Sequence, residues 1–195
     1  MGSVVGQPAL ELAERVAETA KGLGIETAVI GALALAAHGY VRGTVDVDLA
    51  SSVDPGSVLR ALQDKLREGG LKTRLLLPDA EDPLGGMLRV WTEEDDEGDP
   101  VKPLEVVNFA NPYRPAASLG AEAIRTATNL DPASSLRYVQ LDMLVALKLY
   151  AGGLRDLADV VELLACNPHA DLDAVRAACA RFGLEAQFER VLASR

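Results

Sequence analysis

The segment from residue 44 to residue 49 alternates carboxylates with apolar side chains. It reads Thr-Val-Asp-Val-Asp-Leu, and this two-residue period is typical of a β-strand. Because side chains at i and i+2 share one face of a strand, Asp46 and Asp48 are predicted to point the same way. Two such carboxylates repel each other unless a cation lies between them, and paired oxygens suit Mg²⁺ or Mn²⁺. The alternative is an edge strand with a solvated acidic face.

A glycine turn is predicted just upstream of this strand. Residues 27–30 form an apolar strand that runs into Gly31, an Ala/Leu-rich helix follows, and Gly39 ends that helix. A glycine at a strand-to-helix turn lets backbone N–H groups face an anion, so Gly31 is a predicted phosphate site. A phosphate site shortly before a metal-binding pair is what phosphoryl or nucleotidyl transfer requires. His38, alone in this helix, is predicted to be structural.

These segments resemble the nucleotidyltransferase signature of the DNA polymerase β-like superfamily: a hydrophobic residue, Gly, Gly or Ser, a gap, then Asp-x-Asp. The resemblance extends to the bacterial branch that contains AbiEii-type toxins and related small nucleotidyltransferases. The matching positions are Gly31, Ala34, Gly39, Arg42, Thr44, Asp46, Asp48 and Leu49. A second match follows downstream in the family's order and consists of Lys148, Arg155, Asp156 and Asp159.

The resemblance implies a metal-dependent enzyme that moves NMP from an NTP to an acceptor hydroxyl, with pyrophosphate leaving. It implies Mg²⁺ (or Mn²⁺) as cofactor and an NTP as one partner. The acceptor would be a tRNA end, a protein or a small molecule. It also implies a toxin–antitoxin or defence setting, with a cognate antitoxin as a further partner.

The resemblance also assigns site residues. Asp46, Asp48 and Glu105 would be the catalytic residues and the metal ligands, with Glu105 standing on a later strand where the family usually has Asp. Read from the strand pattern alone, Glu105 could equally face solvent. The nucleotide-binding residues would be Gly31, Ala32, Arg42, Thr44, Lys148 and Arg155.

Several of these residues have a structural alternative. Lys148 lies in an apolar stretch, where its ammonium could simply reach solvent. Asp156 and Asp159 suit a helix N-terminus, and Asp159 stands four residues after Arg155, where the two could pair. Arg42 could hold the acids in place or meet a phosphate.

Two positions depart from the family pattern. Ala32 stands where the family usually has Gly or Ser, and Glu105 stands where it usually has Asp. Both departures favour a second hypothesis, a catalytically weak or inactive nucleotide-binding or interaction module of the same fold.

Composition bounds the remaining function classes. The chain of 195 residues carries a net charge of −10, which argues against general nucleic-acid affinity. Much of the acid is concentrated in residues 93–99, a predicted loop. No apolar run approaches the roughly 18 residues of a membrane span and no signal peptide is visible, so a cytoplasmic protein without membrane contact is expected. Cys166 and Cys179 flank apolar helical residues and are predicted to be buried thiols.

The patterns together predict an α+β fold. An α/β nucleotidyltransferase core with a mixed sheet is expected over residues 1–113, followed by a C-terminal helical subdomain over residues 114–195. The predicted strands are 27–30, 44–50, 72–77, 87–92 and 101–109. The predicted helices are 10–23, 31–38, 56–68, 121–128, 134–150, 156–166 and 171–193, the last interrupted near Gly183.

Overall fold

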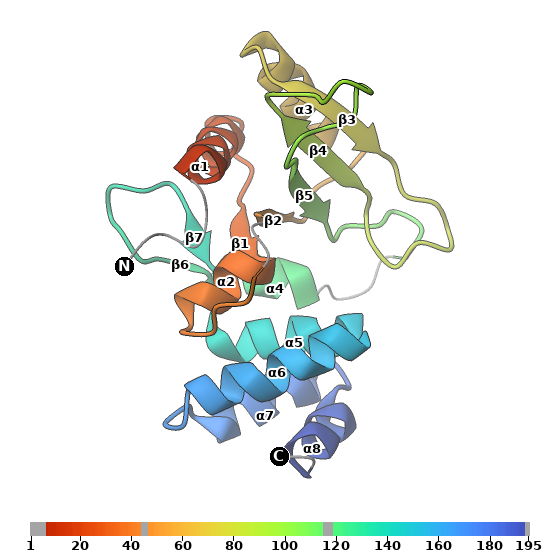
Figure 1. Cartoon of the computed structure of the whole chain (residues 1–195). Helices are drawn as coiled ribbons and strands as arrows, with labels where there is room; N and C mark the ends of the chain where they lie inside the picture. Colours follow the sequence, from red (N-terminus) through yellow and green to blue (C-terminus); the bar gives the residue numbers. More distant parts are fainter. Residues whose placement is uncertain (1–6, 44–46, 115–118, 194–195) are drawn as a thin grey trace.

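A computed structural model describes residues 7–43, 47–114 and 119–193. A mixed seven-stranded sheet crosses the upper part of the molecule in Figure 1, with the helices of residues 7–22 and 58–68 beside it and the C-terminal helices beneath it. The helices are α1 (Gln7–Gly22), α2 (Gly31–Ala37), α3 (Val58–Glu68), α4 (Leu119–Thr126), α5 (Leu141–Ala151), α6 (Leu154–Cys166), α7 (Leu172–Arg181) and α8 (Glu185–Ala193). The strands are β1 (Ala28–Ile30), β2 (Asp48–Ser51), β3 (Lys72–Leu76), β4 (Met87–Trp91), β5 (Leu104–Asn108), β6 (Thr128–Asn129) and β7 (Arg137–Tyr138).

The strand order in the sheet is β3-β4-β5-β2-β1-β7-β6. β2 runs antiparallel to β1 and parallel to β5, while β4 runs antiparallel to both β3 and β5. The α+β prediction, a mixed sheet followed by C-terminal helices, is therefore confirmed. The sheet continues past residue 113, because β7 pairs in parallel with β1.

One face of the β3–β5 region is packed and the other is open. Leu88, Val90, Leu104 and Val106 alternate along β4 and β5 and are buried. They lie on the face covered by α1 and α3, whose contacts include β5 and β3 respectively. The period of two therefore leaves the intervening residues of these strands on the opposite face.

The C-terminal helices form a second layer of packing below the sheet (Figure 1). α5 packs against α4, α6 and α7, and it buries Met143, Leu144, Val145, Ala146 and Leu149. Gly152 ends α5 in the left-handed conformation at φ +66°, so the helix stops in the gap predicted between residues 150 and 156. The interruption predicted near Gly183 is also confirmed, since α7 and α8 are separated there.

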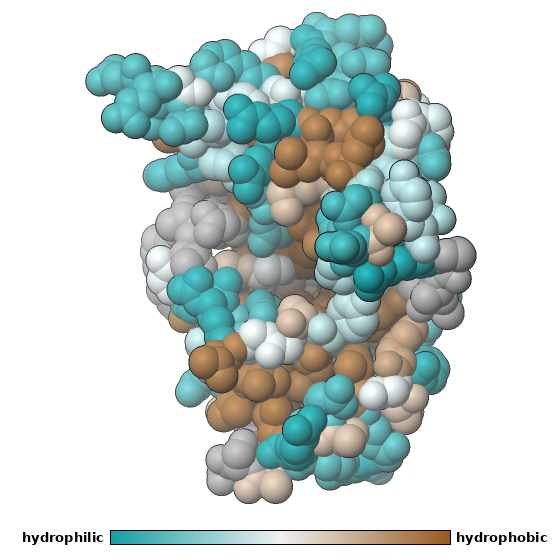
Figure 2. Space-filling view, turned by 90° about the vertical axis from the view of Figure 1, so that its right-hand side faces the viewer, coloured by the Kyte–Doolittle hydropathy of each residue, from teal (hydrophilic) through white to brown (hydrophobic). Residues whose placement is uncertain are grey.

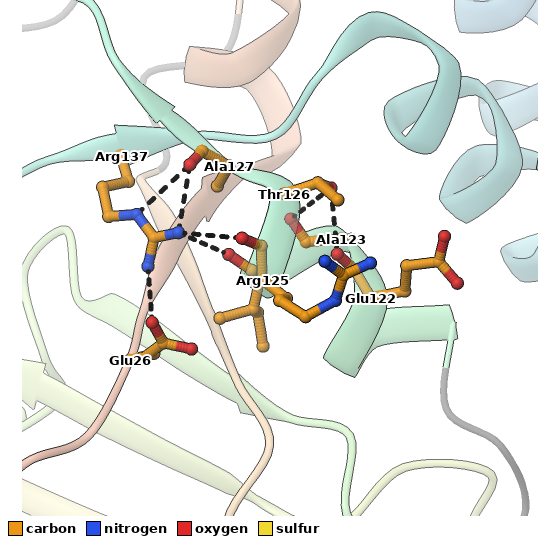
Figure 3. A network of polar contacts seen from close by, with 8 residues as sticks. Glu26, Glu122, Ala123, Arg125, Thr126, Ala127 and Arg137 are labelled. Atoms are coloured by element: carbon orange, nitrogen blue, oxygen red, sulfur yellow. Dashed lines mark hydrogen bonds and ion pairs between the residues drawn. The ribbon is translucent and has the colours of Figure 1, made fainter. Parts of the chain in front are cut away.

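The helix predicted over residues 134–150 begins only at Leu141, so the prediction of helix for residues 134–140 is wrong. Residues 137–138 instead form β7 on the sheet. The guanidinium of Arg137 donates to the main-chain oxygens of Arg125 and Ala127 at the end of α4 and pairs with Glu26 (Figure 3). The backbone of this segment pairs with β1 and β6 instead of within a helix, and such long-range pairing leaves no local pattern in the sequence.

The two cysteines differ in their surroundings. Cys179 on α7 is buried as predicted, and burial, with a contribution from Asp142, raises the pKa of its thiol to about 11. Cys166, at the end of α6, is exposed, which corrects the prediction that it is buried. Within the described ranges, no helix combines the length and apolar character that crossing a bilayer demands.

Candidate active site

Gly31 lies directly against the carboxylate of Asp48. Strands β1 and β2 pair Ile30 with Asp48, so the turn that opens α2 meets the start of β2. Gly31 has φ +63°, which disfavours any other residue, and a Cβ added there would stand 2.1 Å from Oδ2 of Asp48. The backbone conformation therefore favours glycine, and a side chain at this position would have to displace the carboxylate of Asp48.

Glu105 lies beside Asp48 on the neighbouring parallel strand. The β2–β5 register pairs the two residues, so their side chains share one face of the sheet. Adjacent strands are about 4.8 Å apart, which brings both carboxylates within reach of one cation. The side chain of Glu105 is 26% exposed, so it is accessible without being fully solvated. Thr44 and Asp46, the other predicted residues of this segment, lie outside the described residues.

Arg89 joins these acids and was not predicted. Its Nε donates to Oε1 of Glu105 at 2.7 Å, and the β4–β5 register places the two residues opposite each other. The only signal in the sequence is that Arg89 is the one charged residue in the otherwise apolar run 87–91. Asp48, Glu105 and Arg89 together are called the sheet-face cluster below.

A second group of charged residues joins the sheet to the helices. Nη1 of Arg42 lies 2.6 Å from Oδ2 of Asp159, and Nζ of Lys148 lies 2.9 Å from the same oxygen. Nζ of Lys148 also lies 2.8 Å from Oδ1 of Asp156. The side chain of Asp159 is only 3% exposed and that of Lys148 only 12%. These four residues, Arg42, Lys148, Asp156 and Asp159, are called the buried cluster.

The buried cluster decides between the structural alternatives for its members. The ammonium of Lys148 does not reach out to solvent but is held by two carboxylates. The alternative in which Arg155 pairs with Asp159 is wrong. Arg155 is exposed, whereas the carboxylate of Asp159 points inward to Arg42 and Lys148. The turn at residues 152–153 folds α6 back on α5, so partners eight and eleven residues apart meet. 

His38 is structural, as predicted. Its Nε2 lies 2.8 Å from the main-chain oxygen of Val139, and its own main-chain oxygen accepts a hydrogen bond from Asn167. These contacts tie the end of α2 to the segment before α5 and to the end of α6. The imidazole therefore helps to hold the helical layer against the sheet.

The oxygen donors present fit a hard divalent cation. Asp48 and Glu105 supply carboxylate oxygens, the ligands that Mg²⁺ and Mn²⁺ prefer. In the part of the chain that the structure describes, no three His, Cys, Asp or Glu residues group as a metal site. Asp48 and Glu105 are thus the two predicted ligands that the structure describes, and the predicted third ligand, Asp46, stands two residues before Asp48 in the sequence.

Comparison with known proteins agrees with the fold. No family model matches the sequence, and no curated protein matches it. The crystal structure of ANT(2″)-Ia in complex with adenylyl-2″-tobramycin has a TM-score of 0.54 at 14% identity, covering 90% of this chain and 99% of that chain. The solution structure of the antibiotic-resistance factor ANT(2″)-Ia has a TM-score of 0.51 at 18% identity, covering 95% and 93%. The chain therefore has a nucleotidyltransferase fold.

Proposed function

We propose that the protein is a nucleotidyltransferase that moves NMP from an NTP to an acceptor hydroxyl. The observation that carries this proposal is the register of Asp48 with Glu105, directly beside the Gly31 turn. Two accessible carboxylates on adjacent strands, next to a turn without a side chain, suit a cation bound to a phosphate chain. The nucleotidyltransferase fold of the chain supports the same reaction.

Asp46, Asp48 and Glu105 would hold Mg²⁺ or Mn²⁺. When bound, such ions would stabilise the charge on the entering and leaving oxygens. In the transfer, the acceptor oxygen bonds to the α-phosphorus, and the bond from that phosphorus to the bridging oxygen of pyrophosphate breaks. The bonding electrons leave with pyrophosphate, and we assign the acceptor's proton to Glu105. Arg89 orients this carboxylate through one oxygen and leaves the other to meet the substrate.

The nucleotide would lie along the turn that begins α2. Backbone N–H groups of Gly31 and Ala32 are the proposed phosphate ligands, together with the side chains of Arg42, Thr44, Lys148 and Arg155. Because Lys148 is already paired with Asp156 and Asp159, a triphosphate would have to compete with two carboxylates for its ammonium. This competition is a reason to expect weak NTP binding.

The acceptor class is open among a tRNA end, a protein and a small molecule. ANT(2″)-Ia, one of the proteins of similar fold, is bound to adenylyl-2″-tobramycin, which keeps a small-molecule acceptor among the candidates. Kinship with AbiEii-type toxins, and with it a cognate antitoxin, rests on the motif resemblance.

The second candidate function is a nucleotide-binding module without turnover. Two observations favour it: Glu105 is already paired with Arg89, and the methyl group of Ala32 is buried at the phosphate turn. In this case NTP would bind without pyrophosphate release.

The test measures pyrophosphate release and labelled-NMP incorporation with each NTP, Mg²⁺ and pools of RNA, protein and small-molecule acceptors. Wild type should turn over, and Asp48→Asn should lose at least a hundredfold in rate, as expected when a group that stabilises the transition state is removed. Asp96→Asn, in the exposed acidic loop, is the matched control and should keep wild-type activity. NTP binding by calorimetry without turnover in any combination would favour the binding module, and equal rates in Asp48→Asn and wild type would contradict the proposed site.

A further inference from the structure

A groove between α6 and α8 belongs to neither of the two charged clusters. Its volume is about 690 Å³, within the range of roughly 300–1,000 Å³ that is typical of small-molecule sites. Three helices supply its apolar walls: Leu149 comes from the end of α5, Leu157 and Val161 from α6, and Val191 from α8. The groove therefore has the size and the lining of a site for a molecule with an apolar body.

The groove exists because α6 is apolar on two faces. One face turns Leu163 and Leu164 into the core, where both are buried. Leu154, Ala158 and Val161 follow one another at spacings of four and three residues, so they share a second face of the helix. This second face extends over roughly 10 Å at 1.5 Å per residue. Leu154 is 90% exposed, so the second face is open to solvent where it begins.

Apolar surface is visible from outside in the same part of the molecule. Figure 2 views the molecule from the right-hand side of Figure 1, and apolar side chains gather in its lower part, at the level of the C-terminal helices. Tyr150, which lines the groove from the end of α5, is 50% exposed. Contiguous exposed apolar surface often marks an interaction or ligand site. A ligand can therefore reach this groove without displacing side chains of the core.

The charge at the groove is positive. Of the described residues that line it, only Arg190 is charged, and Gln187 adds a neutral amide. Nε of Arg190 donates to the main-chain oxygen of Ala186 at 3.3 Å, and among the described residues its two terminal nitrogens have no partner. The adjacent acid, Glu189, is bound to Arg176 on α7 at 2.6 Å. In a chain whose net charge is −10, an apolar groove with one cation and no acid in its lining favours an anionic ligand.

We infer that this groove binds an amphiphilic carboxylate, a molecule with one carboxylate head and an elongated apolar tail. The tail lies against Leu157 and Val161, and the head accepts paired hydrogen bonds from the terminal nitrogens of Arg190. A planar guanidinium matches a carboxylate in this way, whereas a cationic head would meet like charge. Asp156 and Asp159 lie on the side of α6 that is turned away from the groove, toward Lys148. The site is therefore separate from the proposed transfer of NMP.

The tail and the head contribute to affinity in ways that can be measured separately. Each methylene that the groove removes from water should strengthen binding roughly fourfold until the groove is filled. Loss of the hydrogen bonds between the head and an exposed guanidinium should weaken binding roughly tenfold. A carboxylate of medium chain length therefore tests both contributions in one molecule.

The experiment titrates the full chain with octanoate and with decanoate by calorimetry at neutral pH, below the micelle concentration of each. One saturable site is expected, with decanoate bound roughly fifteenfold more tightly than octanoate. Arg190→Gln should weaken decanoate binding roughly tenfold, whereas Arg190→Lys keeps the charge and should retain most of the affinity. Ala158→Phe places a ring in the groove from an exposed position on α6 and should abolish binding.

The matched controls lie on α3, far from the groove in Figure 1. Arg60 and Ala61 are both exposed there, so Arg60→Gln and Ala61→Phe repeat the two kinds of change outside the site. Both variants should bind decanoate like wild type. Melting curves verify that every variant is folded.

Four outcomes would overturn the inference. Equal decanoate affinity in wild type and Arg190→Gln would mean that the guanidinium does not hold the head. Binding of decylammonium as tight as that of decanoate would leave only adsorption to apolar surface. A reversible dimer in sedimentation equilibrium that Leu154→Gln dissociates would place a second copy of the chain on this face. Flotation with phosphatidylglycerol vesicles, without saturable decanoate binding, would make the face a membrane contact.

Discussion

The sheet-face cluster and the buried cluster contain the same kinds of side chain but differ in access to solvent. In the first, the carboxylate of Glu105 is 26% exposed and lies opposite Arg89 on the same face of the sheet. In the second, the carboxylate of Asp159 is 3% exposed and already has two cationic partners. The two clusters therefore differ in exposure rather than in charge: the carboxylate of Glu105 is open to solvent, whereas that of Asp159 is neutralised inside the fold.

The buried cluster has an indirect connection to the acids. Arg42 immediately precedes the segment that leads to Asp46 and Asp48, and Asp159 anchors it from α6, more than a hundred residues away. A buried ion pair adds little net stability over apolar packing, but removing one partner leaves an uncompensated charge in a low dielectric. The buried cluster thus holds α6 against the segment that leads to Asp48. We expect its loss to lower the free energy of unfolding more than it changes any activity.

The largest expected effect comes from breaking the buried cluster. Asp159→Ala strands both Arg42 and Lys148, so the free energy of unfolding should fall by about 3–5 kcal/mol. For a chain of this size that corresponds to a drop in melting temperature of roughly 10 °C. Urea and thermal unfolding measure it. Asp64→Ala, an exposed carboxylate on α3, is the control and should stay within about 0.5 kcal/mol of wild type. A comparably small loss of stability in Asp159→Ala would mean that the buried cluster does not stabilise the fold more than an exposed carboxylate does.

The second-largest expected effect tests the sheet-face cluster. Glu105→Gln keeps the shape of the side chain and a hydrogen-bond acceptor for Arg89 but removes the charge. Turnover should fall about a thousandfold, near 4 kcal/mol in the barrier, while the unfolding free energy changes little. Steady-state pyrophosphate release and urea unfolding give the two readouts. Glu94→Gln, on the same face but bonded to Lys72 and Trp91, serves as the control. Wild-type turnover in Glu105→Gln would make Glu105 only the partner of Arg89.

Local sequence patterns predicted the parts of this molecule that depend on local physics. The alternation around Asp48, the glycine turn at Gly31 and the helix stop at Gly152 each follow from backbone preferences within a few residues. They were enough to indicate the α+β class and a glycine turn shortly before the acid strand. The short strands β6 and β7 escaped prediction because two-residue strands have no period, and their place in the sheet is set by contacts with β1 and α4.

The charge pairing could not be predicted, because it depends on register and on helix packing. Nothing in residues 87–91 states that Arg89 will stand opposite Glu105, since a one-residue slip would send it to the other face. Similarly, spacing favoured an Arg155–Asp159 pair on one helix, but burial turned Asp159 toward Arg42 instead. Tertiary burial outweighs an exposed i,i+4 pair, which is worth only about 0.3–0.5 kcal/mol.

A third prediction concerns the cation. If Asp46, Asp48 and Glu105 hold Mg²⁺ or Mn²⁺, metal at about a hundred times its dissociation constant should stabilise the fold by about 2.7 kcal/mol, and more with NTP present. Asp46→Asn combined with Asp48→Asn should abolish that shift in melting temperature. Asp95→Asn combined with Asp96→Asn, in the exposed acidic loop, should retain it. An unchanged response in the first double variant would move the cation site away from the sheet-face cluster.

The smallest expected effect concerns Ala32, which lies beside the sheet-face cluster at a position where the resembled family usually has Gly or Ser. Ala32 follows Gly31 in the first turn of α2, and its methyl group is buried, with only 6% of the residue exposed. Ala32→Gly removes that methyl and frees space at the proposed phosphate turn, whereas Ala32→Ser keeps the carbon and adds a hydroxyl that can donate to a phosphate, so both variants should raise turnover a few-fold. Glycine in a helix also costs about 1 kcal/mol of stability, which by itself would not speed the reaction.

The control for this change is Ala34→Gly in the same helix. Ala34 is fully buried and carries the same helix penalty two residues beyond Ala32. Rates of pyrophosphate release for wild type, both Ala32 variants and Ala34→Gly should rise only in the Ala32 variants, with stability lowered alike in both glycine variants. An equal rise in Ala34→Gly would attribute the gain to a looser α2. If no variant turns over while calorimetry still shows NTP binding, the protein binds nucleotide without transferring it. In that case the carboxylate of Glu105 in the sheet-face cluster serves only as the partner of Arg89, as the charges of the buried cluster serve one another.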